Sequence, residues 1–245
     1  MRKTLGVVVR LAARAVRFEV GLYWSLLRWV ARRPAVPTGT VAVPYVGGVA
    51  AVLWLFIFLS AVELVALHLL LPWEPVRLVL DVLGLWGLVW GLGLAAGFRV
   101  YPHLVGDAGL VVRHGRRTVA VIAWDALATA ETRRRDRGGS RALQLEEGPD
   151  GTVLHVVIGG RTNIDLALRH PLELALPQGR RTVSTLRLWA DDPVALVTRA
   201  QAAGAGGAAP VQPFRPVRPV RPTRPARPSR SGGPVRRADR PTDAA

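Results

Sequence analysis

Two long apolar runs, separated by a short helix-breaking turn, dominate the first hundred positions of the chain. In the run 46–71 only Glu63 carries a full charge at neutral pH, and about 26 helical residues rise roughly 39 Å, enough to cross a hydrocarbon core of about 30 Å with some tilt. A turn with two prolines at 72–75 is followed by a second run, 76–97. The pattern predicts a two-helix transmembrane hairpin over 45–98, although a hairpin buried in a soluble domain gives similar runs.

Basic residues flank this hairpin on both sides. Those before it are Arg2, Lys3, Arg10, Arg14, Arg17, Arg28, Arg32 and Arg33, and those after it are Arg99, Arg113, Arg116 and Arg117. Only Arg77 lies near the turn. Because cytoplasmic loops are enriched in Lys and Arg, we expect a multi-pass protein of the plasma (inner) membrane with both termini in the cytoplasm. Tyr45 and Trp73 are expected at the membrane–water interfaces.

Four polar side chains fall within or beside the predicted spans: Glu63, His68, Arg77 and Asp81. Arg77 and Asp81 are four residues apart on one helix face, and His68 has a similar depth on the facing helix. We therefore expect a polar clamp in which Asp81 contacts both His68 and Arg77. Glu63 is deeper, roughly 12 Å from the turn at 1.5 Å per residue. It is either a functional site or a group held protonated or bonded to a partner.

The second run contains two pairs of glycines at helical spacing, Gly87/Gly91 and Gly93/Gly97. Small residues at this spacing let helix backbones approach closely. They indicate either packing against the first span or a homo-oligomer contact.

The N-terminal segment, 1–44, is predicted to be a basic amphipathic helix that ends before Pro34. Arg10, Arg14 and Arg17 share one face, and large apolar side chains occupy the rest. A basic helix that carries tryptophan is typical of the membrane interface, where its arginines reach anionic headgroups. Packing against the cytoplasmic domain is the alternative.

After Arg99 the pattern changes to the two-residue period of strands. The chain then shows alternating or β-rich runs at 108–113, 117–124, 141–147, 152–158, 162–169, 171–176 and 182–190. The charged stretch from Arg133 to Ser140 is predicted to be a loop. Asp192, followed by Pro193, is predicted to cap a final helix. We expect residues 99–203 to form a small antiparallel β-domain of about seven strands plus this C-terminal helix.

This element order resembles the pleckstrin-homology (PH) fold, a bent seven-strand sheet closed at one end by a C-terminal helix. More closely, residues 45–203 resemble uncharacterised bacterial membrane proteins of the actinobacterial type that carry two spans before a cytoplasmic PH-like domain. The resemblance rests on Arg99-Val100-Tyr101-Pro102-His103, the strand Gly109–Gly115, Trp124 and Asp191-Asp192-Pro193. It implies an α+β membrane protein and no catalytic motif. An unrelated small β-barrel or sandwich fits the same strand pattern.

From residue 204 the composition changes to Ala, Gly, Pro and Arg. Proline at this density favours polyproline II, which has three residues per turn, so 204–245 is predicted to be a disordered tail. The arginines that repeat at this period are Arg215, Arg218, Arg221, Arg224 and Arg227. Anionic lipid is their expected contact, with a reader of Pro-rich peptides as an alternative. Nucleic acid is not favoured, because only Phe214 interleaves an aromatic ring.

The sequence offers little catalytic chemistry. It has no cysteine, its histidines lack metal-ligand spacing, and no serine sits in a Gly-x-Ser-x-Gly turn. We therefore expect no enzymatic activity, no cofactor and no metal. The favoured function is a membrane-anchored binding or scaffold module with anionic lipid and an unknown protein as partners. The alternative is an accessory subunit of a transporter, secretion or cell-envelope complex that uses the intramembrane polar residues.

Overall fold

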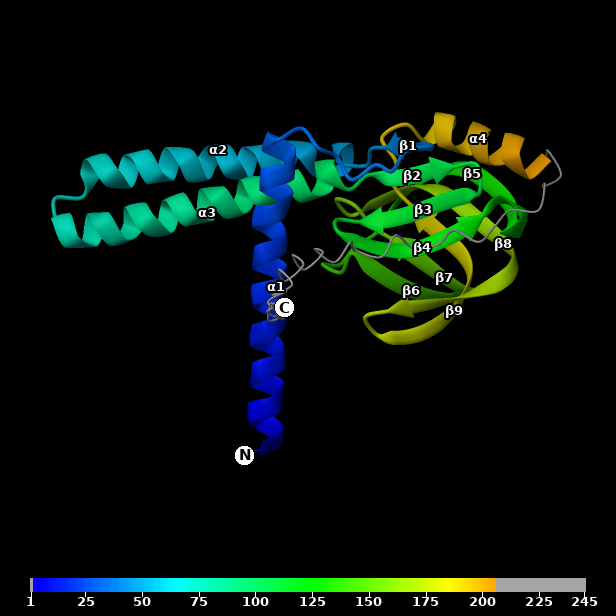
Figure 1. The fold of residues 1–245 in the computed structure, drawn as a ribbon, viewed down its shortest axis with the longest axis horizontal. Helices are drawn as coiled ribbons and strands as arrows, with labels where there is room; N and C mark the ends of the chain where they lie inside the picture. The colour runs from blue at the N-terminus through cyan, green and yellow to red at the C-terminus, as the bar shows by residue number, and fades with distance from the viewer. Residues whose placement is uncertain (1, 206–245) are drawn as a thin grey trace, which may run out of the picture. The chain divides into compact units, whose positions relative to one another are not determined.

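The computed structural model describes residues 2–205, in which the chain forms four α-helices and two β-sheets (Figure 1). The predicted Arg/Pro-rich tail lies outside these residues. The predicted lipid contacts that lie outside the described side chains are Arg10, Arg215, Arg218, Arg221, Arg224 and Arg227.

Helices α2 (Gly47–Leu70) and α3 (Glu74–Val100) lie side by side as a hairpin (Figure 1). Pro75 stands in the first turn of α3, where a missing amide costs no helical hydrogen bond. Both helices are long and apolar enough to cross a membrane, and only 6% of the most apolar stretch of α2 and 17% of that of α3 is buried in the protein. A core helix of a soluble protein would bury most of that stretch. The exposed apolar surface therefore favours the membrane interpretation.

Helix α1 (Arg2–Val30) packs mainly against α3 rather than against the sheets. Leu22 lies against Gly93, where an added Cβ would overlap with the leucine, and the rings of Phe18 and Trp90 have centroids 6.2 Å apart. Large apolar side chains of α1 remain exposed at Val9, Val16, Val20, Leu27 and Val30. An exposed apolar stripe beside a row of arginines is typical of a helix in the membrane interface.

The strands form two sheets. The first has the order β1-β2-β3-β4 and contains β1 (Thr40–Val43), β2 (His103–Gly106), β3 (Gly109–His114) and β4 (Arg117–Ala123). The second has the order β5-β8-β9-β7-β6 and contains β5 (Leu127–Asp136), β6 (Leu143–Gly148), β7 (Gly151–Val156), β8 (Arg161–Leu176) and β9 (Gly179–Leu188). Neighbours are antiparallel except β7 and β9, which pair in parallel, so the predicted all-antiparallel arrangement is wrong at this pair.

Both sheets contribute to one hydrophobic core. Its fully buried members include Leu110 and Ile122 from the first sheet and Leu154, Leu166 and Leu186 from the second. Burial of such side chains contributes about 1.5–3 kcal/mol each, so this core is the main source of the domain's stability.

Helix α4 (Pro193–Ala205) packs on β5. Leu196 and Ala200 face the core. The predicted N-cap is confirmed, because the amide of Ala195 donates to Asp192 Oδ1 at 2.9 Å.

The observed strands differ from the predicted ones at β1, β2, β5 and β8. Strands β1 and β2 were not expected because they adjoin the apolar spans. Strand β5 runs through Arg133–Asp136, so the loop predicted there is wrong. The alternation of apolar and polar residues along β5 is weak, because Leu127 and Ala130 are the only residues of this strand that are buried. Strand β8 is one long strand rather than two, with a register shift between Ala167 and Leu172 that allows Pro171 to lie in it.

Candidate functional site

The hairpin is inserted between two hydrogen-bonded strands. The chain leaves β1 at Val43 and returns into β2 at His103, and these two residues are partners in the antiparallel ladder. Both ends of the hairpin are therefore fixed beside each other at the sheet. If the two helices cross a membrane, the segments before and after them must lie on the same side.

Asp191, just before α4, ties the β-domain to the start of α2. Its Oδ1 accepts hydrogen bonds from the amide of Gly47 at 2.9 Å and the indole of Trp189 at 3.2 Å. Its own amide donates to the carbonyl of Pro44 at 2.9 Å. A carboxylate at a helix N-terminus satisfies an orphan amide and complements the helix dipole. The β-domain therefore supplies the cap of α2.

Glycines make the approach between α2 and the β-domain close. Gly159 has φ +58°, and a Cβ added to it would overlap with the backbone carbonyl of Gly48. A Cβ added to Gly48 would lie 3.0 Å from the side chain of Ile158. The two backbones therefore meet directly, with no side chain between them.

Tyr45 and His103 form a buried stack at the same junction, with ring centroids 4.5 Å apart. The amide of Gly115 donates to the Tyr45 hydroxyl at 2.7 Å. The amide of Arg113 donates to His103 Nδ1 at 3.0 Å, and His103 Nε2 donates to the carbonyl of Trp189 at 3.0 Å. This pairing requires the neutral Nε2–H tautomer. The interfacial position predicted for Tyr45 is wrong, because its hydroxyl finds a partner inside the protein.

Burial shifts the pKa of both side chains in the direction that disfavours the charged form. It raises the pKa of Tyr45 to about 12 and lowers the pKa of His103 to about 4. Both side chains are therefore neutral near pH 7. The stack is a structural joint rather than an acid–base pair.

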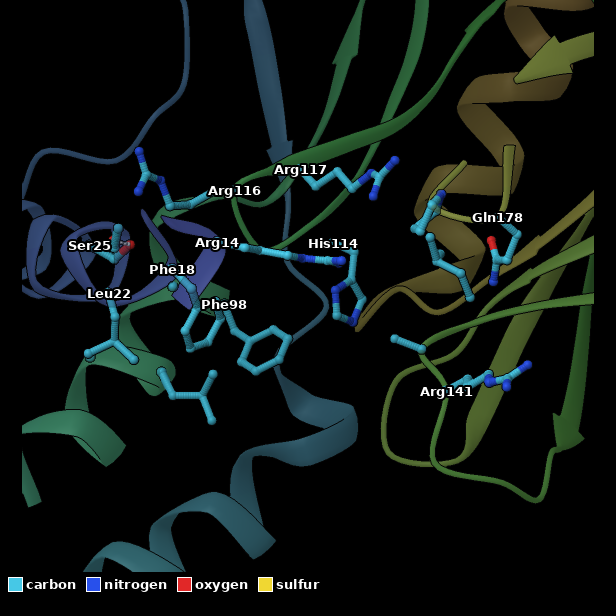
Figure 2. Close-up of a pocket in the computed structure, with 18 residues that line it drawn as sticks. Arg14, Phe18, Leu22, Ser25, Phe98, His114, Arg116, Arg117, Arg141 and Gln178 are labelled. Atoms are coloured by element: carbon cyan, nitrogen blue, oxygen red, sulfur yellow. Dashed lines mark hydrogen bonds between the residues drawn. The ribbon is translucent and has the colours of Figure 1, made fainter. Parts of the chain in front are cut away.

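A cavity of about 690 Å³ lies between α1, the last turns of α3 and three connections of the β-domain (Figure 2). One part of its lining is basic, and Figure 2 shows Arg14 reaching from α1 toward His114. The other part is apolar, with Phe18 and Phe98 among its members. The basic lining consists of Arg14, Arg116, Arg117 and Arg141, and no Asp or Glu of residues 2–205 lines the cavity.

The four arginines lie differently around the cavity: the Arg14 side chain runs toward His114, whereas the guanidinium group of Arg116 points away from Arg14 (Figure 2). Within residues 2–205 none of them forms an ion pair, and Arg117 alone donates a hydrogen bond, to the carbonyl of Ala175 at 3.1 Å. Arg116 lies against Gly21 of α1, where a Cβ would overlap with its guanidinium. Burial lowers the pKa of His114, so this ring adds no charge near pH 7. The cavity suits an anion attached to an apolar group.

Of the three arginines of α1 that are predicted to contact lipid headgroups, the structure describes the side chains of Arg14 and Arg17. Arg14 lines the cavity. Arg17 is exposed, and its Nε donates to the carbonyl of Ala13 at 3.0 Å.

The polar groups of the hairpin are only partly brought together. His68 Nδ1 lies 2.7 Å from Asp81 Oδ2, as predicted across the helices. Arg77 forms no ion pair with Asp81 in the described part of the chain, so the predicted three-member clamp is wrong. The imidazole occupies one carboxylate oxygen, and Asp81 Oδ1 is buried without a partner.

Glu63 has no hydrogen-bond or ion-pair partner within residues 2–205. It lines a groove of about 480 Å³ between α2 and α3, with Ser60, Leu83 and Gly87 among the neighbours. Glu63 is exposed. It therefore remains separate from the His68–Asp81 pair.

The glycines of α3 serve mostly contacts inside the chain. Gly91 faces Ile57 of α2, while Gly93 and Gly97 face α1 at Leu22 and Ser25. A Cβ added to Gly87 would meet no atom of another part of the described chain within 4 Å. The homo-oligomer contact remains a prediction, with Gly87 as the member of the two pairs that stays open.

The sequence did not reveal the cavity or the Asp191 cap. Arg116 and Arg117 follow the turn signal His114-Gly115, which can be detected in the sequence. That they line the same cavity as Arg14 and Arg141 depends on tertiary packing. Asp191 stands beside the more obvious cap, Asp192, and its partner Gly47 is distant in sequence.

Comparison of the chain with protein-family models, curated proteins and solved structures gives no match. Within residues 2–205 no group of three His, Asp or Glu side chains is placed to hold a metal ion. Function is therefore argued from the junction, the cavity and the hairpin.

Proposed function

We propose that this protein is a membrane-anchored binding module that holds a PH-like β-domain at the cytoplasmic face of the plasma membrane. The hairpin spans the bilayer, both termini are cytoplasmic, and the domain binds rather than catalyses. The observation that carries the proposal is the insertion of the hairpin between paired strands β1 and β2. This insertion leaves little freedom between anchor and domain.

Three further features support this orientation. The arginines flank the hairpin at its domain end, where cytoplasmic segments carry positive charge. Trp73, 70% exposed, stands at the opposite turn, where interfacial aromatic side chains are common. The amphipathic helix α1 presents its exposed valines beside the same end of α3. Two sheets around one core with a C-terminal helix support the PH-like assignment.

Site-specific photo-crosslinking in cells tests the binding role. One crosslinker replaces Val121, which is exposed on β4, and another replaces Leu83, which is exposed on α3 and lines the Glu63 groove. If the protein is a binding module, the crosslinker at Val121 should capture a partner. The amount captured should not change when Glu63→Gln is added. Capture through Leu83 alone would contradict it.

The second candidate function is an accessory subunit of a membrane complex. It is favoured by one observation, the unpartnered Glu63 in an exposed groove between the two apolar helices. An ionisable group at that depth is costly unless a partner satisfies it. This function predicts a stoichiometric polytopic membrane protein captured through Leu83 and lost in Glu63→Gln.

A further inference from the structure

We propose that the cavity between α1, α3 and the β-domain binds one anionic phospholipid, with its phosphate at the arginines and its glycerol and first acyl carbons at the apolar end. This inference rests on the proposed membrane anchoring. It assigns a ligand to a site that the anchoring alone does not define.

The position of the cavity along α3 matches the headgroup region. From Glu74 to Leu94, which lines the cavity, the helix rises about 30 Å at 1.5 Å per residue. That distance equals the thickness of a hydrocarbon core of about 30 Å. With the turn at one face of the bilayer, the cavity lies where the phosphates of the other face are found.

The charge of the cavity selects an anion. Arg14 comes from α1, Arg116 from the turn between β3 and β4, Arg117 from the start of β4, and Arg141 from the segment before β6. None of the four arginines has a carboxylate partner in the described chain, so an anion that enters the cavity meets positive charge without a competing acidic group, and its phosphate can accept charge-assisted hydrogen bonds from a guanidinium group. The chain's own 215–230 segment is itself basic, so like charge opposes its entry.

The apolar part of the lining distinguishes a lipid from a free anion. Phe18 and Leu22 of α1 and Leu94 and Phe98 of α3 line the same cavity. A volume of about 690 Å³ falls in the usual range for sites of small organic ligands, about 300–1,000 Å³. Inorganic phosphate fills only the basic end, whereas a phospholipid covers both parts.

The test measures lipid binding to the delipidated full chain in detergent by native mass spectrometry. The probes are phosphatidylglycerol, phosphatidylcholine, inorganic phosphate and the deacylated headgroup glycerophosphoglycerol. We expect one phosphatidylglycerol per chain, bound at least ten-fold more tightly than phosphatidylcholine. The two soluble anions should compete poorly.

Paired variants connect the binding to the cavity. Arg14→Gln with Arg141→Gln should weaken phosphatidylglycerol at least ten-fold. Arg133→Gln with Arg134→Gln removes the same charge from exposed positions of β5 that form no ion pair in residues 2–205 and should have little effect. Thermal unfolding confirms that both proteins are folded, and Arg116→Gln replaces the first pair if that pair is unstable.

Several results would overturn the inference. Equal affinity for both lipids, equal loss in the two pairs of variants, or displacement by the soluble anions at the lipid's own concentration would each do so. A short acidic peptide serves as a further probe, and its preferential binding over phosphatidylglycerol would overturn the inference and assign the cavity to a protein partner. Binding in detergent does not depend on orientation in a membrane, so its failure leaves the topology of the proposed function to be judged separately.

Discussion

Gly159 is the position where the junction between hairpin and β-domain is most sensitive to one added methyl group. Its neighbour Gly160 has a similar backbone, with φ +75° against +58°, but its added Cβ would meet nothing closer than 3.5 Å. Alanine in the left-handed conformation costs about 1–2 kcal/mol at either position. At Gly159 the overlap with the Gly48 carbonyl adds roughly 1–3 kcal/mol, because a backbone atom cannot rotate away. We therefore expect Gly159→Ala to lose about 2–5 kcal/mol and Gly160→Ala about 1–2 kcal/mol.

The assay compares thermal unfolding of the two variants in detergent with the distance between spin labels at Val52 and Val121. Both positions are exposed, and the chain has no cysteine, so labels attach only where cysteine is introduced. Gly159→Ala should lower the unfolding temperature further and broaden the distance distribution, while Gly160→Ala should keep it narrow. Equal destabilisation with unchanged distances in both variants would refute a direct backbone contact at this junction.

Three other perturbations follow from burial, protonation and the hairpin. Leu166→Asp should remove the protease resistance of the β-domain, because burial of an unpaired charge costs several kcal/mol. Leu145→Asp, at a partly buried position, should reduce protease resistance less. Equal losses of resistance in the two variants would show that the core face is assigned wrongly. Burial lowers the pKa of His103 to about 4, while in the unfolded chain it is about 6.5. Between these two pH values the unfolded chain binds a proton that the folded chain does not. The contribution of buried His103 to stability is therefore complete above about pH 6.5 and is lost as the pH falls toward 4. NMR of the labelled imidazole should show no titration above pH 5, and a midpoint near 6.5 would contradict its burial. Asp81→Ala should reduce the amount of protein in membranes because His68 loses its partner, whereas Glu63→Gln should leave that amount unchanged.

The elements with strong local signals were predictable from sequence. The two apolar helices, the proline-rich turn between them and the Asp192 cap all follow from runs, spacing and capping chemistry. Strands β1, β2 and β5 escaped prediction because their pairing depends on distant segments. In the sequence, the four residues of β1 look like a linker, because this strand forms only when β2 provides its hydrogen-bonding partners.

The site was less predictable than the fold for the same reason. Arg14 was expected to meet lipid headgroups, but its neighbours Arg116 and Arg141 are more than a hundred positions away along the chain. The periodicity of α3 also did not distinguish Gly93 and Gly97, which face α1, from Gly87, which has no neighbouring side chain of the described residues against it. Local patterns report faces and spacings, whereas a cavity depends on which faces the fold brings together.

In the proposed topology the hairpin crosses the membrane and returns both flanks to the cytoplasm. Three single-cysteine proteins test it with a membrane-impermeant maleimide: Val41→Cys on β1, Trp73→Cys in the turn and Val121→Cys on β4, all at exposed positions. On intact cells with a permeable outer layer, we expect labelling at position 73 alone. On inverted membrane vesicles, we expect labelling at 41 and 121 alone. Labelling of 41 or 121 from outside, or of 73 only from inside, would contradict the account.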